Sequence, residues 1–350
     1  MTKNTKIFRV SSQADDRQIR EAALILSAGG LVAFPTETVY GLGADALNLQ
    51  AVLQIFKAKG RPADNPLIVH VDSVESCRKL VKSIPEKARL LMDKFWPGPL
   101  TLIMERKELV PDITTGGLDT VAVRMPENGI ALKLIQYSGK PLAAPSANLS
   151  GKPSPTTADH VIRDLSGRID AVVDGGDVTI GLESTVIDMT SELPAILRPG
   201  KVSREEIEAC IGDVTIGYDD KVHPESETVR SPGMKYTHYS PDSNVILVEG
   251  EHEEVVSKIK EFVVDFEQRN AKTGLLLTKE SEGFFPDSLV FCLGERSKAE
   301  QVAKNLFYGL RHLDEQNTDV ILVDGSFSQD GIGMAVFNRV RKAADMIIKV

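Results

Sequence analysis

The amino-acid sequence predicts an α/β protein built from two domains. Short apolar runs of strand length alternate with amphipathic segments of helical period along most of the chain. At 350 residues the chain is long enough for two hydrophobic cores. After residue 200 the composition shifts toward Gly, Pro, Asp and Ser without lasting periodicity. We therefore expect a first domain over residues 1–205, a linker over 206–243 and a smaller domain over 244–350.

The overall composition is that of a globular protein, with 42% hydrophobic and 26% charged residues. No apolar run approaches the roughly 18 residues of a membrane span, and the N-terminus lacks the apolar core of a signal peptide. We therefore expect a cytoplasmic protein with no membrane partner. The cysteines Cys77, Cys210 and Cys292 lie far apart without paired spacing, which predicts reduced thiols and no metal cage.

Charge is unevenly distributed along the chain. Residues 1–200 hold 23 Lys and Arg against 23 Asp and Glu, whereas residues 201–350 hold 18 against 27. A nucleic-acid-binding domain normally shows a net basic composition, which neither part has. We expect no stable nucleic-acid binding, and the local basic clusters suit a small anionic ligand.

The first elements lead into a stretch of small, hydroxylated and basic residues. A helix is predicted over residues 15–28, followed by a buried strand at 31–34 that Pro35 ends. We interpret Gly41 and Gly43 as loop positions that allow positive φ and close backbone approach.

A second helix is predicted over residues 50–59, with its cap within 45–48 and its end at Gly60. Three cations cluster where it ends: Lys57, Lys59 and Arg61. They either cap the carboxyl end of the helix favourably or form a clamp for a polyphosphate.

Two later strands end in basic side chains. The strand at 67–70 ends in His70, which is either a core residue or a site residue at the end of a strand. The strand at 120–124 alternates so that Thr120 and Arg124 share one face. Arg124 makes either a surface ion pair or a bidentate contact with a ligand carboxylate. Helices are also predicted at 74–94, broken at Pro85, and at 128–138.

Small and hydroxylated residues dominate the loop at 145–154, which is either a flexible connector or a phosphate-binding turn. Glu183 opens another hydroxylated turn and is either a general base or the partner of Arg124 or of a backbone amide. Arg198 is held in a rigid Arg-Pro-Gly turn, which suits a phosphate.

The chain after residue 243 alternates strands and helices in the manner of a small parallel domain. Its four predicted strands are NVILVE, TGLLLT, SLVFCL and DVILVD, and its helices fall at 252–270, 296–316 and 333–346. The loop GSFSQDGIG at 325–333 fits neither nucleotide-binding glycine fingerprint, so we interpret it as structural.

These motifs resemble the YrdC-type family of threonylcarbamoyl-AMP synthases. The resemblance rests on PTETVYGLG, KGRP, NPLIVH, DTVAVRMP, AAPSANLSGKPSPTT, ESTVID and LRPG, which follow in the family's order over the first 200 residues. SPGMKYTHYSP at 231–241 resembles the linker of the family's two-domain form. The resemblance implies a twisted open α/β sheet with a concave site, followed by a Rossmann-like parallel domain.

The implied reaction joins L-threonine, bicarbonate or CO₂, and ATP into L-threonylcarbamoyl-AMP and pyrophosphate. Such an enzyme is a nucleotidyltransferase that uses Mg²⁺ with its ATP and supplies a tRNA-modifying threonylcarbamoyl transferase complex. Because the motifs contain no convincing nucleophile, we expect catalysis by alignment of the substrates and stabilisation of charge.

The resemblance also assigns the site residues. L-Threonine is expected at Thr38, His70, Arg124, Ala144 and Ser184. ATP is expected at Arg61, Asn65, Thr120, Ser146, Ser154, Arg198 and Tyr236, with Lys57, Lys59 and Arg61 on its phosphates. No protein side chain is assigned to a metal, and the segment at 231–241 is expected to close over the nucleotide as a lid.

Two other functions compete with this one. The first is an RNA-binding module with a concave basic surface, which the balanced charge of the first 200 residues disfavours. The second is carbamoyl transfer in hydrogenase maturation. Enzymes of that class carry additional zinc-finger and acylphosphatase-like segments, whereas this chain has three scattered cysteines.

Overall fold

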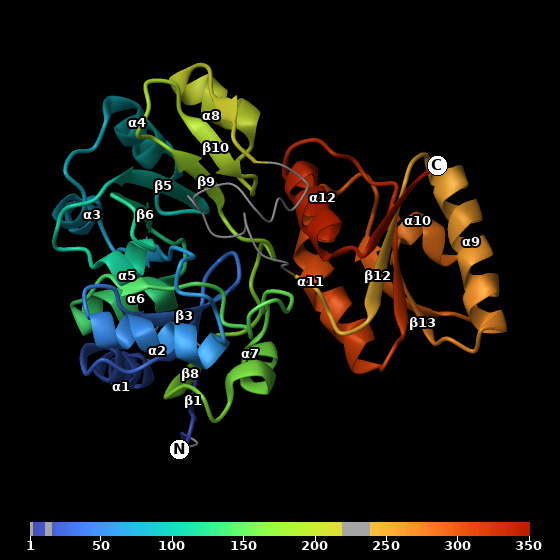
Figure 1. The fold of residues 1–350 in the computed structure, drawn as a ribbon, viewed down its shortest axis with the longest axis horizontal. Helices are drawn as coiled ribbons and strands as arrows, with labels where there is room; N and C mark the ends of the chain where they lie inside the picture. Colours follow the sequence, from blue (N-terminus) through green and yellow to red (C-terminus); the bar gives the residue numbers. More distant parts are fainter. Residues whose placement is uncertain (1–2, 11–15, 219–238) are drawn as a thin grey trace.

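The computed structural model describes residues 3–10, 16–218 and 239–350 and contains two β-sheets with helices packed around them (Figure 1). The sheet of the N-terminal body has the strand order β1-β8-β2-β3-β7-β4-β6-β5-β9-β10-β11. The sheet of the C-terminal body has the order β14-β13-β15-β12-β16. The predicted α/β class is confirmed, while the predicted boundary residues of the domains stay a prediction.

The N-terminal body contains eleven strands and eight helices among the described residues. The strands are β1 (Lys6–Arg9), β2 (Val32–Pro35), β3 (Tyr40–Asp45), β4 (Ile68–His70), β5 (Leu100–Glu105), β6 (Thr120–Arg124), β7 (Leu142–Ala143), β8 (Ala171–Asp174), β9 (Thr185–Asp188), β10 (Ala195–Arg198) and β11 (Thr215–Ile216). The helices are α1 (Asp16–Ser27), α2 (Leu49–Lys59), α3 (Val74–Leu80), α4 (Glu86–Phe95), α5 (Asp112–Thr115), α6 (Gly129–Ser138), α7 (Ala158–Leu165) and α8 (Arg204–Ile211).

The predicted loop around Gly41 and Gly43 is wrong, because these residues belong to β3, which pairs antiparallel with β2. Neither glycine has a positive φ. A Cβ at Gly43 would lie 2.6 Å from the ring of Phe34, so glycine is needed there for close approach. The turn between β2 and β3 places residues 36–39 at the end of these two strands.

Helix α2 has the ends that its sequence predicts. The side chain of Asn48 accepts hydrogen bonds from the backbone N–H groups of Gln50 and Ala51, at 3.0 and 3.2 Å. Gly60 ends the helix in the left-handed conformation, with φ of 64°. This cap turns the chain back toward β4 and places Arg61 beside the pocket described below.

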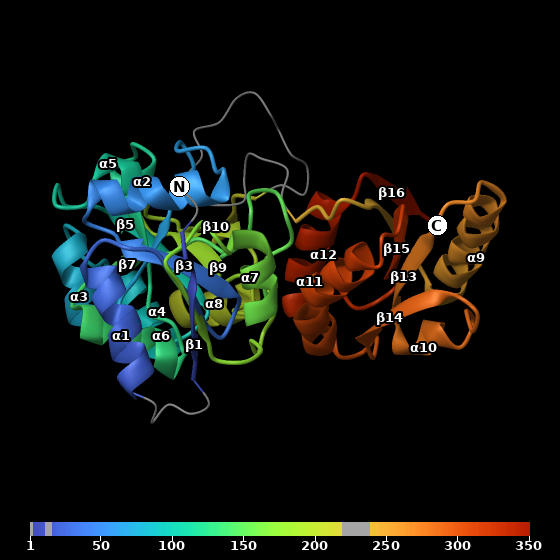
Figure 2. The ribbon, with the colours of Figure 1, turned by 90° about the horizontal axis from the view of Figure 1, so that it is seen from below.

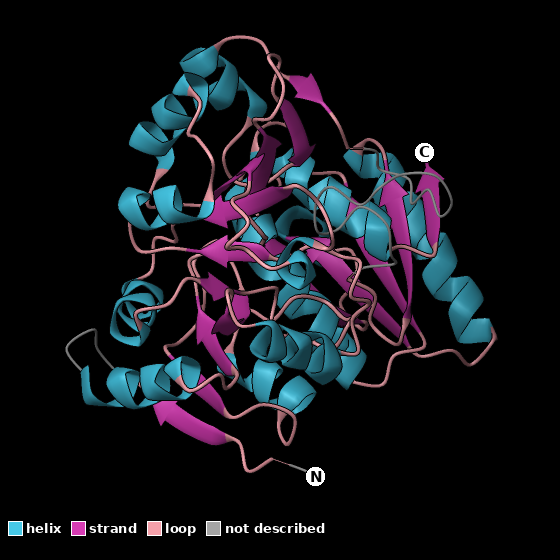
Figure 3. Cartoon of the chain, turned by 60° about the vertical axis from the view of Figure 1, so that its left-hand side comes forward, coloured by secondary structure: helices cyan, strands magenta, loops and turns pink. Residues whose placement is uncertain are grey.

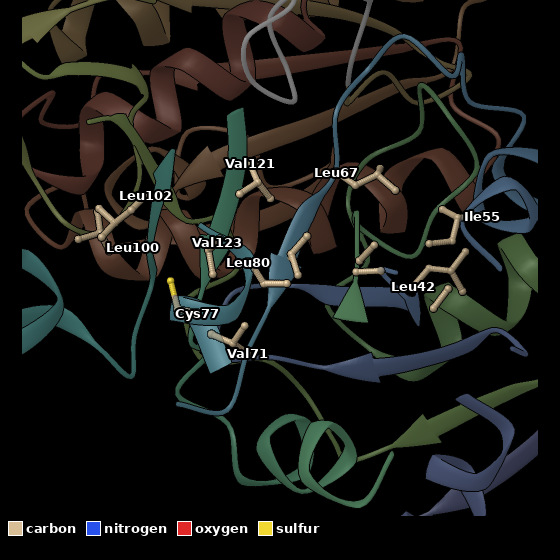
Figure 4. Packing of buried hydrophobic residues seen from close by; sticks show 14 of the residues in the cluster. Leu42, Ile55, Leu67, Val71, Cys77, Leu80, Leu100, Leu102, Val121 and Val123 are labelled. Carbon is tan, nitrogen blue, oxygen red and sulfur yellow. The ribbon is translucent and has the colours of Figure 1, made fainter. Parts of the chain in front are cut away.

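Two hydrophobic layers cover the large sheet, and Figure 3 shows helices on both of its sides. One layer packs α1 and α6 against β1, β2 and β8. The larger layer packs α2, α3 and α4 against the central strands, and Figure 4 shows its core around Leu42, Leu67 and Val123. The predicted free thiols are confirmed, with Cys77 buried in this core.

The C-terminal body is a parallel sheet, as predicted. Its strands are β12 (Asn244–Glu249), β13 (Thr273–Thr278), β14 (Leu289–Gly294), β15 (Val320–Gly325) and β16 (Met346–Lys349). Its helices are α9 (His252–Gln268), α10 (Lys279–Glu282), α11 (Ala299–Glu315) and α12 (Ile332–Ala343). The last predicted helix ends earlier than expected, because residues 346–349 pair with β12 as a fifth strand.

Helices α11 and α12 face the N-terminal body, whereas α9 covers the far side of the small sheet (Figure 2). Val39, Leu182 and Tyr239 join the hydrophobic cluster formed by α11 and α12. A Cβ at Gly181 would lie 2.5 Å from the Cα of Lys304, so helix α11 packs directly on this loop. None of the helices in the described ranges is long and apolar enough to cross a membrane.

Candidate active site

A pocket opens where the β2–β3 turn, the ends of α2, β4 and β6, and the loop after β7 come together. Strands β4 and β6 are parallel neighbours and place His70 directly beside Arg124. Nine of the predicted site residues line this pocket: Thr38, Lys59, Arg61, His70, Arg124, Ala144, Ser146, Ser154 and Arg198. The structure therefore brings together residues that are up to 160 positions apart in the sequence.

Arg124 is buried at one end of the pocket, with only 4% of its surface exposed. Its Nη1 donates to the Thr38 hydroxyl at 3.0 Å, and its Nε donates to the Gly98 carbonyl at 3.3 Å. Its Nη2 lies 2.6 Å from a carboxylate oxygen of Glu37, an ion pair whose alignment falls short of a hydrogen bond. A buried donor at Nη2 is thus left for a ligand acceptor.

His70 stays neutral beside this arginine. Burial, together with the positive charge of Arg124, lowers the pKa of His70 to about 3. A neutral imidazole adds no charge to this end of the pocket. The positive charge there is that of Arg124, which is paired with Glu37.

Lys59 organises the small-residue loop. Its Nζ donates to the carbonyls of Ser146 and Asn148, at 2.6 and 2.5 Å. Burial, with Arg61 nearby, lowers the pKa of Lys59 well below its usual range. Because Lys59 engages the loop carbonyls, it shapes the loop around Ser150, whose N–H donates to the Lys59 carbonyl at 2.9 Å.

Arg198 lies on another wall of the pocket. Its Nε and Nη2 donate to the carbonyl and hydroxyl of Ser184, at 3.0 and 3.1 Å. Burial, with Arg339 nearby, lowers the pKa of Arg198 to about 10, so it remains a cation at neutral pH. The neighbouring Glu183 pairs with Arg339 at 3.0 Å. The pairing of Glu183 with Arg124, one of the alternatives left open by the sequence, is not formed among the described residues.

Sequence comparison places this pocket within a known family. The profile of the Sua5/YciO/YrdC family, described as telomere recombination, matches residues 24–200. The profile described as threonylcarbamoyl-AMP synthase, C-terminal domain, matches residues 202–345. The threonylcarbamoyl-AMP synthase of Pyrococcus abyssi is 50% identical over 352 residues, covering 99% of this chain and 100% of the relative. The chain belongs to the threonylcarbamoyl-AMP synthase family.

Further relatives extend this match. The threonylcarbamoyl-AMP synthase of Bacillus subtilis is 47% identical over 331 residues, covering 94% of each chain. The solved structure of P. abyssi Sua5 complexed with L-threonine is 50% identical and has a TM-score of 0.93, covering 99% of this chain and 100% of that one. The resemblance inferred from the sequence motifs is thus confirmed, and as a member of this family the chain is an enzyme.

Four residues predicted from the threonylcarbamoyl-AMP synthase motifs lie outside the pocket lining: Lys57, Asn65, Thr120 and Ser184. Lys57 is exposed, because residues two apart on a helix point to different sides. Thr120 shares a face with Arg124 but lies four residues away along β6, which is about 13 Å. Ser184 is fully buried and supports Arg198 from behind. The expected contact of Lys57 with phosphates, like the expected ligand contacts of Thr120 and Ser184, stays a prediction.

Asn65 does not line the pocket, yet its side chain is buried without hydrogen-bond partners among the described residues. The residue is 1% exposed. A buried amide without partners is rare in a folded protein and is compatible with a ligand contact after local adjustment. Its expected contact with ATP stays a prediction. Tyr236 and most of the expected lid lie outside the described residues.

Tyr239 and Glu183 also line the pocket. The sequence singled out Glu183 as a general base or an ion-pair partner without assigning it to a ligand, and it made no assignment for Tyr239. Tyr239 belongs to the motif at 231–241, and its aromatic neighbours were the available signal. Its ring stacks on Phe307 with centroids 5.1 Å apart. Glu183 follows a glycine that lies directly against α11, a contact that no local pattern reveals.

The residues at the pocket do not form a cage for a metal ion. Within residues 3–10, 16–218 and 239–350, no group of three His, Cys, Asp or Glu side chains is arranged to hold one.

Proposed function

We propose that this enzyme forms L-threonylcarbamoyl-AMP and pyrophosphate from L-threonine, bicarbonate or CO₂, and ATP. The observation that carries the proposal is the buried Arg124 at the end of the pocket, whose Nη2 lacks a well-directed acceptor. A ligand carboxylate would satisfy this donor, and its amino group would then point into the pocket. The P. abyssi relative, of the same fold and length, has been solved with L-threonine.

The other walls of the pocket suit a nucleotide triphosphate. Arg61 and Arg198 supply cations, and the loop at 146–154 supplies hydroxyls and backbone N–H groups. ATP would enter as its magnesium complex, with the ion held by the phosphates. The buried side-chain amide of Asn65, which has no hydrogen-bond partner among the described residues, would contact the nucleotide.

The chemistry is an adenylyl transfer, which makes the enzyme a nucleotidyltransferase. The amino group of L-threonine adds to the carbon of CO₂ with loss of a proton, or to that of bicarbonate with loss of water, and gives a carbamate. A carbamate oxygen then attacks the α-phosphorus of ATP, and the bond to the β-phosphate breaks to release pyrophosphate. The pocket residues supply alignment and positive charge, and the substrates supply every reacting atom. Arg61 and Arg198 would stabilise the charge that develops on the leaving pyrophosphate.

The product is a mixed anhydride that must be consumed quickly. We propose that it passes in the cytoplasm to a threonylcarbamoyl transferase that modifies adenosine in tRNA. This enzyme itself would need no tRNA, since its small-molecule pocket accounts for all three substrates.

Mass spectrometry of the reaction mixture tests the function directly. Full-length protein incubated with L-threonine, bicarbonate, ATP and Mg²⁺ should form threonylcarbamoyl-AMP and an equal amount of pyrophosphate. Omission of any one substrate should abolish both products. Pyrophosphate release that does not depend on L-threonine, or release with carbamoyl phosphate in place of L-threonine and bicarbonate, would contradict the proposal.

A further inference from the structure

An arginine of the C-terminal body pairs with a residue that lines the pocket. Arg339 lies on α12 and is fully buried. Its Nε donates to a carboxylate oxygen of Glu183 at 3.0 Å. The other carboxylate oxygen of Glu183 accepts from the Ser154 hydroxyl at 2.5 Å. Since Glu183 and Ser154 both line the pocket, a continuous chain of contacts runs from α12 to the site.

Glu183 also balances the charge of two buried guanidinium groups. Burial by itself would raise the pKa of Glu183, but Arg339 and Arg198 together hold it below its usual value. Arg198, whose hydrogen bonds go to the carbonyl and hydroxyl of Ser184, experiences the charges of both Glu183 and Arg339. Loss of Arg339 would leave Glu183 free to turn toward Arg198 and to draw it away from a phosphate.

A second arginine of the same body supports the same loop. Arg311 on α11 donates to the carbonyl of Pro153 through Nε at 3.0 Å and through Nη2 at 2.5 Å. It also forms two hydrogen bonds with Asp164, at 3.1 and 2.7 Å. Asp164 in turn accepts from the N–H of Leu149 at 3.2 Å. Arg311 thus holds the loop at 149–154 directly at Pro153 and, through Asp164 of α7, at Leu149.

We propose that Arg339 is a positioning residue for the nucleotide side of the site, acting through Glu183 on Ser154 and Arg198. The C-terminal body thereby holds residues that line the pocket in position. This inference rests on the proposed function for its kinetic test, although its structural test does not.

The variant Arg339→Gln, made in the full-length chain, tests the proposal. We expect the KM for ATP to rise roughly tenfold or more, because a buried charge pair at the site loses one partner. The KM for L-threonine should change less than about twofold, because Arg124 keeps its contacts. The matched control is Arg341→Gln on the same helix. Arg341 pairs with Glu249 at 2.6 and 3.0 Å. Neither residue lines the pocket, so the loss of Arg341 should leave both KM values unchanged.

Hydrogen–deuterium exchange gives a readout that needs no turnover. Peptides covering residues 180–186 should exchange about tenfold faster in Arg339→Gln than in the unchanged chain, and no faster in Arg341→Gln. If Arg339→Gln fails to fold, Arg339→Lys keeps the charge with two nitrogens fewer and should raise the KM for ATP several-fold.

Three outcomes are separable. Unchanged exchange and an unchanged KM for ATP in Arg339→Gln would overturn the inference while the unchanged chain still makes product. Equal rises in the KM values for ATP and L-threonine, or equal effects of the two glutamine variants, would reduce Arg339 to a structural role and also overturn it. If the unchanged chain makes no threonylcarbamoyl-AMP, the proposed function falls, and the exchange rates alone decide on Arg339.

Discussion

Replacing Arg124 with alanine should weaken the binding of L-threonine much more than that of ATP. Arg124 is the arginine at the carboxylate end of the pocket, and ATP is expected to lie along Arg61 and Arg198. A hydrogen bond to a charged group contributes about 1.5 to 3 kcal/mol, which corresponds to roughly 10- to 150-fold in affinity. We expect a loss within that range.

The same substitution should also destabilise the fold. It leaves the carboxylate of Glu37 buried at 6% exposure without its cation, and breaking a buried pair in this way costs about 3 to 5 kcal/mol. The double variant Arg124→Ala with Glu37→Ala removes the uncompensated charge. It should recover most of the free energy of unfolding while the affinity for L-threonine stays low.

Calorimetric titration with L-threonine and with a non-hydrolysable ATP analogue measures the two affinities, and urea unfolding measures the stability. An affinity for L-threonine within twofold of that of the unchanged chain would refute the assignment of Arg124. A double variant that recovers affinity together with stability would show that Arg124 acts only through the fold.

Three other substitutions probe the loop, the contact between the bodies and the buried histidines. Lys59→Met should weaken the binding of an ATP analogue about tenfold in the same titration, because two loop carbonyls lose their donor, whereas the exposed Lys57→Met should have no effect. Gly181→Ala should lower the free energy of unfolding by several kcal/mol more than Gly176→Ala, because both positions have a positive φ but only the first meets another backbone. The free energy of unfolding should fall as the pH drops from about 6.5 to 3. His160 has a pKa of about 3 in the folded chain, so over this range it takes up a proton only in the unfolded chain. Urea titrations at several pH values should therefore show a weaker pH dependence for His160→Gln.

Local signals in the sequence account for much of this structure. Asn48 and Gly60 end α2 as expected, since caps depend on residues a few positions apart. Arg124 reaches the pocket because it ends a strand, and the period of two fixes its face. The same period says nothing of distance along the strand, so the expected contact of Thr120 with ATP stays a prediction.

Contacts between distant parts of the chain were beyond the reach of those signals. Glu183 finds its cation 156 residues away, on a helix whose sequence shows only ordinary amphipathic spacing. Lys59 holds two backbone carbonyls of a loop nearly 90 residues later, a contact that the sequence did not predict, and its expected contact with phosphate stays a prediction. Both placements follow from tertiary packing, which a single sequence does not specify.

The order of the strands in the small sheet sets a sequence of events during synthesis. Strand β12 is the first of its sheet to be made, yet both of its neighbours, β15 and β16, come last. Strand β12 therefore cannot pair with β15 or with β16 until residues 320–349 have been synthesised. Throughout that interval Asp164 and Glu183 are already synthesised and still lack Arg311 and Arg339. The nascent N-terminal body thus carries these two acidic groups without their cations until α11 and α12 have been synthesised and pack against it.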